Sequence, residues 1–137
     1  MLWSTYYGGS KANSDQYLGG TLEVDEAGRV WLTGMTNSSD LPTRNASQPA
    51  NGGGDFDGFV AAISSDGNKL CYGSYFGGNG HDTLEGLVAA GGRIYASGIS
   101  SSTNLKQKRS QIQRGYGGGR YDAVIIGLDV PVDRGCH

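Results

Sequence analysis

Charge is scarce in this chain: only 18% of residues are charged, and 11 Lys and Arg nearly balance 13 Asp and Glu, for a formal net charge of -2. That balance gives no reason to expect general attraction to nucleic acid or to a membrane surface. Long apolar runs are missing too, since none approaches the roughly 20 residues of a membrane-spanning helix. No basic, apolar leader follows Met1. We therefore expect no nucleic-acid partner and no membrane insertion.

Helix signals and cysteines are also few. No apolar series with the spacing of a helix face persists, because the 25 glycines interrupt every candidate. The two cysteines and two distant histidines are too few ligands for a metal site, so we expect neither a metal nor a cofactor. For the cysteines we favour a buried thiol at Cys71 and a mobile thiol in the tail at Cys136. A disulfide is the alternative.

What the chain does contain is an internal repeat of roughly 65 residues. Three blocks recur, and each first copy pairs with its second copy as follows: Leu2–Gly9 and Leu70–Gly78, Gly28–Gly34 and Gly92–Gly98, Gly52–Val60 and Gly117–Ile125. A repeat of this length marks an array of supersecondary units, none of which can bury its apolar faces alone. Two copies are fewer than the roughly three that such arrays need, so something else must complete the fold.

Each repeat carries strand signals in place of helix signals. Alternating or apolar runs bounded by Gly and Asp turns predict β-hairpins in both repeats, four strands to a unit, which matches one blade of a β-propeller. Phe59–Ile63 and Ala123–Ile126 are apolar at successive positions, so both faces of these strands should be buried between stacked sheets. Four residues at matching positions should lie in that core: Trp31, Tyr95, Phe59 and Val124.

The motifs of the first repeat are those of a known family. They are the Tyr-hydrophobic-Gly-Gly of Tyr6–Gly9, Val24–Gly28, Val30–Thr43 and Asp57–Val60. Jointly they resemble the bacterial SBBP (seven-bladed) β-propeller repeat family, over nearly the whole chain to Leu128. The second repeat departs from the pattern at Ala89-Ala90 and at Lys106. The resemblance implies a propeller, usually within a large secreted or surface protein, and it implies no reaction.

The family pattern names the strands of a blade from a, the innermost, to d, the outermost. In the first blade, at about residues 20–76, they are Thr21–Asp25, Arg29–Met35, Gly58–Ser64 and Lys69–Phe76. The second blade, at about 86–128, has strands a to c, while Leu2–Tyr7 is a d strand without a blade. The chain therefore reads d-abcd-abc, an all-β propeller segment of two four-stranded antiparallel blades followed by a tail at 129–137.

Two blades cannot close into a ring, so this order predicts a partner. Residues 2–8 of another copy would supply the outer strand of the second blade, which hides the strand edges that otherwise promote aggregation. The ring is then a homotrimer or homotetramer. Alternatively, the remaining blades belong to a longer parent chain.

The long connections between strands b and c, at residues 37–56 and 101–121, share one rim of the predicted fold with the long loop Gly8–Gly20. Long irregular loops are usually functional. The second connection is basic and holds the candidate ligand-binding residues Lys106, Lys108, Arg109, Arg114, Tyr116 and Arg120. With Tyr121 beside them, these could hold an acidic glycan or another anion through charge-assisted hydrogen bonds. The simpler interpretation is a solvated or interchain loop.

No catalytic residues are predicted. Asp57 and Asp122 occupy equivalent repeat positions and should form a structural turn or a hydrogen bond between blades, and Asp25 should form a turn. His81-Asp82 should lie in an exposed polar loop. The leading hypothesis is a non-enzymatic structural or ligand-binding module, extracellular or at a bacterial cell surface. A lectin-like carbohydrate-binding propeller and a propeller hydrolase are the alternatives.

Overall fold

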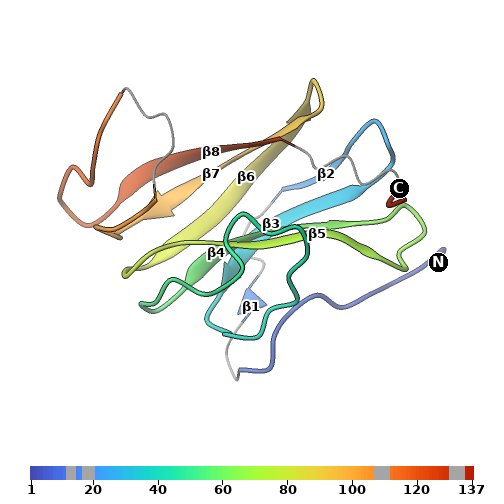
Figure 1. The fold of residues 1–137 in the computed structure, drawn as a ribbon, viewed down its shortest axis with the longest axis horizontal. Helices are drawn as coiled ribbons and strands as arrows, with labels where there is room; N and C mark the ends of the chain where they lie inside the picture. The colour runs from blue at the N-terminus through green and yellow to red at the C-terminus, as the bar shows by residue number, and fades with distance from the viewer. Residues whose placement is uncertain (12–14, 17–20, 107–111, 130–134) are drawn as a thin grey trace.

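The computed structural model describes residues 1–11, 15–16, 21–106, 112–129 and 135–137, and every regular element in that part of the chain is a β-strand (Figure 1). The strands are β1 (Asp15–Gln16), β2 (Leu22–Val24), β3 (Val30–Thr36), β4 (Asp57–Ile63), β5 (Leu70–Phe76), β6 (Asp82–Ala90), β7 (Arg93–Ser100) and β8 (Asp122–Asp129). The prediction of an all-β fold is confirmed. The described residues contain no helix that could cross a membrane.

The strands form two antiparallel sheets, one from each half of the chain. The first sheet has the order β1-β3-β4-β5, and β2 also pairs with β3. Since β1 pairs with one end of β3 and β2 with the other end, these two short strands share one edge. The second sheet is β6-β7-β8. The strand pairing follows the predicted order, but β1 was not anticipated, because residues 8–20 were expected to form a loop.

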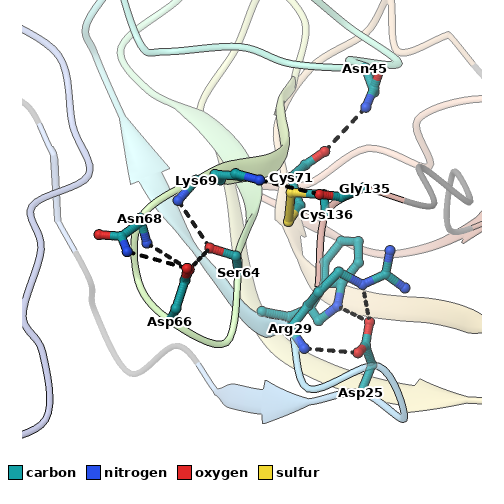
Figure 2. Close-up of a disulfide and its surroundings, with 11 residues drawn as sticks. Asp25, Arg29, Asn45, Ser64, Asp66, Asn68, Lys69, Cys71, Gly135 and Cys136 are labelled. Carbon is teal, nitrogen blue, oxygen red and sulfur yellow. Dashed lines mark hydrogen bonds and ion pairs between the residues drawn. A yellow bond between two sulfur atoms is a disulfide. The ribbon is translucent and has the colours of Figure 1, made fainter.

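The turn between β2 and β3 is organised by Asp25, as predicted. Its Oδ1 accepts hydrogen bonds from the backbone amides of Ala27 and Arg29, and its Oδ2 accepts one from Trp31 Nε1 at 2.8 Å. The Oδ2 atom also accepts a hydrogen bond from Arg29 Nε at 2.7 Å, and Figure 2 shows Arg29 against this carboxylate. Partial burial acts to raise the pKa of Asp25, but the hydrogen bonds from Trp31 and Arg29 outweigh it and lower the pKa below its usual value. The carboxylate therefore stays ionised and holds the turn.

The main core lies between the two sheets. Trp31 and Val60 of the first sheet pack there with Leu84, Ile94 and Ala96 of the second, and all five are essentially excluded from water. A smaller cluster covers the opposite face of the first sheet and is built from Phe59, Tyr75 and Leu41, with Tyr7 and Leu32 against it. Strand β4 is thus covered on both faces, as its apolar run predicted.

The second sheet departs from the predicted burial. Trp31 and Phe59 are buried as expected and Val124 is half-buried, but Tyr95 is 39% exposed. In β8 burial alternates residue by residue, so the prediction that both of its faces are buried is wrong for this chain. The physical reason is that one face of the second sheet packs on the first sheet while no described segment covers the other. We call the side of each sheet that points away from the other sheet its open face.

Cys71 and Cys136 form a disulfide, with 5.5 Å between their Cα atoms (Figure 2). The favoured prediction of two separate thiols is therefore wrong, and the alternative is correct. Cys136 is only 2% exposed and packs in the main core, so the end of the chain returns to β5 of the first sheet. Lys69 Nζ, at the start of this region, also donates a hydrogen bond to the carbonyl of Gly135.

The N-terminal segment Leu2–Tyr7 pairs with no described strand of this chain. It lies along the first sheet, where Trp3 Nε1 donates a hydrogen bond to the carbonyl of Ser65 at 3.0 Å. The ring of Tyr7 packs on Phe59 with 5.6 Å between centroids. The segment is therefore docked on the open face of the first sheet without being part of its hydrogen-bonded ladder.

Candidate functional site

Two hydrogen-bond networks of the same design fix the long loops at one end of the molecule. In the first, Asp57 at the start of β4 accepts hydrogen bonds from the backbone amide of Gly52 at 2.6 Å and from Gln48 Nε2 at 3.3 Å. The loop between β3 and β4 is thereby folded back onto the sheet from which it emerges.

The second network repeats the first at the start of β8. Asp122 accepts hydrogen bonds from the backbone amide of Gly117 at 2.5 Å and from Gln113 Nε2 at 2.9 Å. The structural role predicted for Asp57 and Asp122 is thus seen in both repeats. The two glutamines were missed, although they recur at the same repeat spacing in the sequence.

A further carboxylate, Asp82 at the start of β6, lies next to Asp57 where the sheets meet. Asp82 accepts hydrogen bonds from the Gly78 amide at 2.9 Å, from Ser102 Oγ at 2.6 Å and from Ser100 Oγ. A Cβ atom at Gly77 would clash with Asp57 Oδ1 and would lie 2.9 Å from Asp82 Oδ2. The absence of a side chain at this glycine therefore lets the two carboxylates approach each other.

The environment of Asp57 disfavours its ionised form. Both carboxylates are completely buried, and Asp57 Oδ1 has no hydrogen-bond partner among the described residues. Burial, opposed by the hydrogen bond from Gly52 but helped by the negative charge of Asp82, raises the pKa of Asp57 to about 6. Near neutral pH this group lies close to its protonation midpoint.

The prediction that His81-Asp82 forms an exposed polar loop is wrong. Asp82 is 0% exposed and begins a strand, and His81 is half-buried. The reason is that Ser100 and Ser102, far away in sequence, provide the hydroxyl groups that allow the carboxylate to be buried. Nothing local to positions 81 and 82 signals those partners.

Beside these networks lies a shallow depression of about 310 Å³, lined in part by Asp55, His81, Arg120 and Tyr121. The His81 imidazole lies between the rings of Phe56 and Tyr121, with centroid distances of 5.5 and 5.8 Å. The Arg120 guanidinium lies 5.4 Å from the centroid of Tyr121. A cation, an aromatic ring, an imidazole and a carboxylate therefore converge on one small surface.

The structure separates the predicted ligand-binding residues. Arg120 lines the depression, whereas Arg114 and Tyr116 line a groove beside β8, and Lys106 lines another cavity between the sheets. The remaining two, Lys108 and Arg109, lie outside the described residues. The depression instead brings in His81 and Tyr121. Tyr121 stands beside the predicted cluster in the sequence and recurs at the repeat position of Phe56, after the same run of glycines, whereas His81 carries no such signal.

The groove beside β8 follows an unpaired strand edge. In the described part of the chain β8 pairs with β7 on one side only. Its other edge opens into two adjoining cavities of about 450 and 930 Å³, which residues from Ala123 to Asp129 help to line. In the first sheet the corresponding edge of β4 is filled by β5.

The described residues contain no group of three or more His, Cys, Asp or Glu side chains placed to hold a metal ion. The sequence matches no protein-family model, and it matches no curated protein. What this end of the molecule can do therefore follows from its geometry. The depression can bind a ligand through charge, stacking and hydrogen bonds, whereas the carboxylates beneath it are sealed from solvent.

Proposed function

We propose that this chain is a non-enzymatic β-propeller module of a secreted or surface-exposed bacterial protein, and that its long-loop rim binds an acidic glycan. The observation that carries the proposal is the convergence of Arg120, Tyr121, His81 and Asp55 on one depression. An arginine beside an aromatic ring suits an acidic sugar, because the guanidinium pairs with the carboxylate while the ring stacks on the pyranose. The carboxylate of Asp55 can accept hydrogen bonds from sugar hydroxyl groups.

The propeller architecture is supported by the way in which the two sheets stack. They pack face to face through a shared core, and the loops joining their strands carry the same Gln-Gly-Asp network at repeat-related positions. In a radial array of blades, each blade contacts its neighbours in the same way, so the contacts between blades must repeat along with the strands. The SBBP family assignment rests on the sequence motifs alone.

The disulfide supports the extracellular assignment. Disulfides persist in oxidising compartments and are rare in the bacterial cytoplasm of ordinary mesophiles. The Cys71–Cys136 bond joins parts of the chain that are far apart in sequence and lies in the core, so it is structural in character.

A non-enzymatic role is supported by the burial of the acidic pair. General acid–base catalysis requires that the catalytic group reach its substrate. Asp57 and Asp82 are both 0% exposed and are engaged by loop amides and serine hydroxyls. Their hydrogen bonds tie the loops to the start of β4 and β6, which favours the binding module over the propeller hydrolase.

Calorimetric titration with polygalacturonate tests the proposed ligand class, with neutral dextran as the carbohydrate control. We expect binding to the acidic polymer alone, weakened by added salt. Arg120→Ala should weaken it about tenfold or more, the loss of a charge-assisted hydrogen bond. Arg93→Ala is the matched control, because Arg93 is an exposed arginine that pairs with Asp129 at the opposite end of β7. Equal affinity of the Arg120→Ala variant, or equal binding of dextran, would contradict the proposal.

A further inference from the structure

Apolar side chains are exposed on the open faces of both sheets. On the open face of the second sheet, Val88, Tyr95 and Ile125 are 48%, 39% and 81% exposed. On the open face of the first sheet, Leu22 and Val24 are 57% and 55% exposed. Contiguous apolar surface of this kind on a sheet commonly marks an interaction site.

The exposed residues of the second sheet are repeat counterparts of core residues in the first. Tyr95 and Ile125 occupy the strand positions of Trp31 and Val60, as the pairing of β7 with β8 and of β3 with β4 shows. Trp31 and Val60 are each 1% exposed, because they pack against the other sheet. The open face of the second sheet therefore carries apolar residues at the same positions as the face of the first sheet that packs on a neighbouring sheet.

The exposed residues of the first sheet are repeat counterparts of residues in the second sheet that pack on the first sheet in the main core. By their pairing across the hairpins, Leu22 and Val24 correspond to Leu87 and Ala89. Leu87 is 8% exposed and Ala89 is half-buried, both against the main core. The two open faces thus reproduce the two halves of the interface between the sheets, one half on each side of the molecule.

The residues that follow β5 show which contacts connect the outer strand of one sheet to the next sheet. After β5, the backbone amide of Asn79 donates a hydrogen bond to Asn104 Oδ1 at 2.8 Å. The next amide, of Gly80, donates one to Ser102 Oγ at 2.8 Å. These contacts anchor the residues that follow β5 to the loop that leaves β7.

The N-terminal segment makes the same contacts with the first sheet. The backbone amide of Ser10 donates a hydrogen bond to Asp40 Oδ1 at 2.9 Å, and that of Lys11 donates one to Ser38 Oγ at 3.2 Å. By the repeat, Ser10 and Lys11 correspond to Asn79 and Gly80, and their acceptors correspond in the same way: Asp40 to Asn104 and Ser38 to Ser102. Leu2–Tyr7 therefore already lies where the outer strand of a preceding sheet would lie, although that sheet is missing from this chain's described structure.

From these counterparts we infer that a second copy of this chain docks head to tail on the first. The β6-β7-β8 sheet of one copy would pack its open face, with Tyr95 and Ile125, on the open face of the next copy's first sheet. The N-terminal segment of that next copy would pair antiparallel with the unpaired edge of β8 and fill the groove beside it. The inference does not depend on the ligand proposed for the rim.

The pairing register follows from the first sheet. Val60 of β4 pairs with Ser74 of β5. Their repeat counterparts are Ile125 of one copy and Thr5 of the next. A contact of this kind joins two different surfaces, so it propagates until the chain of copies closes on itself. Since each copy supplies two sheets, a closed ring of six or eight blades contains three or four copies.

Size-exclusion chromatography with light scattering tests the assembly. We expect a particle of three or four times the 14.3 kDa of one chain. Ile125→Lys should convert it to a monomer with an unchanged circular dichroism spectrum, because Ile125 is 81% exposed within a single chain. Ala27→Lys, in the exposed β2–β3 turn, adds the same charge and should leave the particle intact. A wild-type monomer at high concentration, or an assembly insensitive to Ile125→Lys, would overturn the inference.

Cross-linking tests the register and identifies the segment that is exchanged. A Thr5→Cys chain mixed with an Ile125→Cys chain should form a disulfide between copies under mild oxidation. The same Ile125→Cys chain mixed with an Ala27→Cys chain should not. Equal cross-linking in the two mixtures would overturn the strand pairing even if the particle is an oligomer.

Discussion

The two sheets come from two copies of one repeat, yet only the first contains a strand that is buried on both of its faces. In β4 every residue from Asp57 to Ile63 is buried, whereas burial in β8 alternates from Asp122 to Asp129. Both strands are equally apolar in their central positions. The difference arises from what lies beside each strand, namely β5 and the docked N-terminal segment for the first sheet and neither for the second. Local sequence selects a strand in both repeats, and its neighbours decide how far it is buried.

The largest expected effect comes from truncating the same strand position in each sheet. Trp31→Ala should cost about 3–5 kcal/mol in the free energy of unfolding, as a core truncation that also removes the hydrogen bond to Asp25. Tyr95→Ala should cost less than about 1 kcal/mol, because its side chain is partly solvated. Urea unfolding of both variants in an Ile125→Lys background, which prevents any assembly from contributing, gives the comparison. Equal costs would show that the second sheet has a second cover within the chain.

Removing the disulfide should have the next largest effect. Cys71→Ala with Cys136→Ala opens a loop with a sequence separation of 65. The chain-entropy model gives about 4 kcal/mol of destabilisation for a loop of this length. Thermal unfolding of the double variant should match that of the reduced wild-type protein. If a reductant leaves the wild-type unfolding curve unchanged, the cysteines are the separate thiols that the sequence favoured.

The Asp57 carboxyl should give the protein an unusual dependence on pH. Its pKa is about 6 when folded and about 3.9 when unfolded, so the folded state binds its proton more tightly. The associated stability is fully present below about pH 4 and is lost as the pH rises through 6, a change of about 2–3 kcal/mol. Asp57→Asn should remove this dependence of the free energy of unfolding on pH, which urea unfolding from pH 4 to 7 measures. Asp122→Asn is the matched control at the equivalent position, and an identical effect of both variants would contradict the assignment to the buried pair.

The smallest change in the free energy of unfolding should come from Asp25, and its dependence on pH has the opposite sign to that of Asp57. Its folded pKa is lowered, so its stabilising contribution is present above about pH 4 and is lost as the pH falls. Asp25→Asn should cost about 1 kcal/mol at pH 7, the loss of a partly exposed ion pair with Arg29, and this cost should shrink as the pH falls below about 4. The turn between β6 and β7 has no such carboxylate and uses Gly91 and Gly92 at positive φ instead. A cost that does not shrink as the pH falls would show that the amide cannot hold the turn.

The strands could be predicted from the sequence because their signals are local. The apolar run at Phe59–Ile63 and the turn glycines fix where the chain extends and where it reverses, and the repeat supports the assignment in a second copy. The exposure of Tyr95 could not be predicted, because it depends on a neighbour that the sequence of β7 does not describe. The burial of Asp82 likewise depends on hydroxyl groups of Ser100 at the end of β7 and Ser102 in the loop that follows.

The candidate site was predictable only in part. The long-loop rim and Arg120 could be selected from the sequence, since basic residues cluster in that loop. His81 was missed as a binding residue, because its ring contact with Tyr121 joins two loops that are distant in sequence. The sequence could not decide whether the two cysteines form a disulfide, for a similar reason. The repeat spacing places Cys136 at the counterpart of Cys71, but it does not say that the tail returns to β5 of the first sheet.

That disulfide also determines how the molecule would carry mechanical load. A pulling force applied at His137 enters the chain at Cys136 and passes directly across the sulfur bridge to Cys71 in β5. All of the second sheet lies within the covalent loop and is therefore shielded from the tension. The force is resisted by the pairing of β5 with β4 instead. Under such a force, the tail would act as a tether to the better-buried half of the fold.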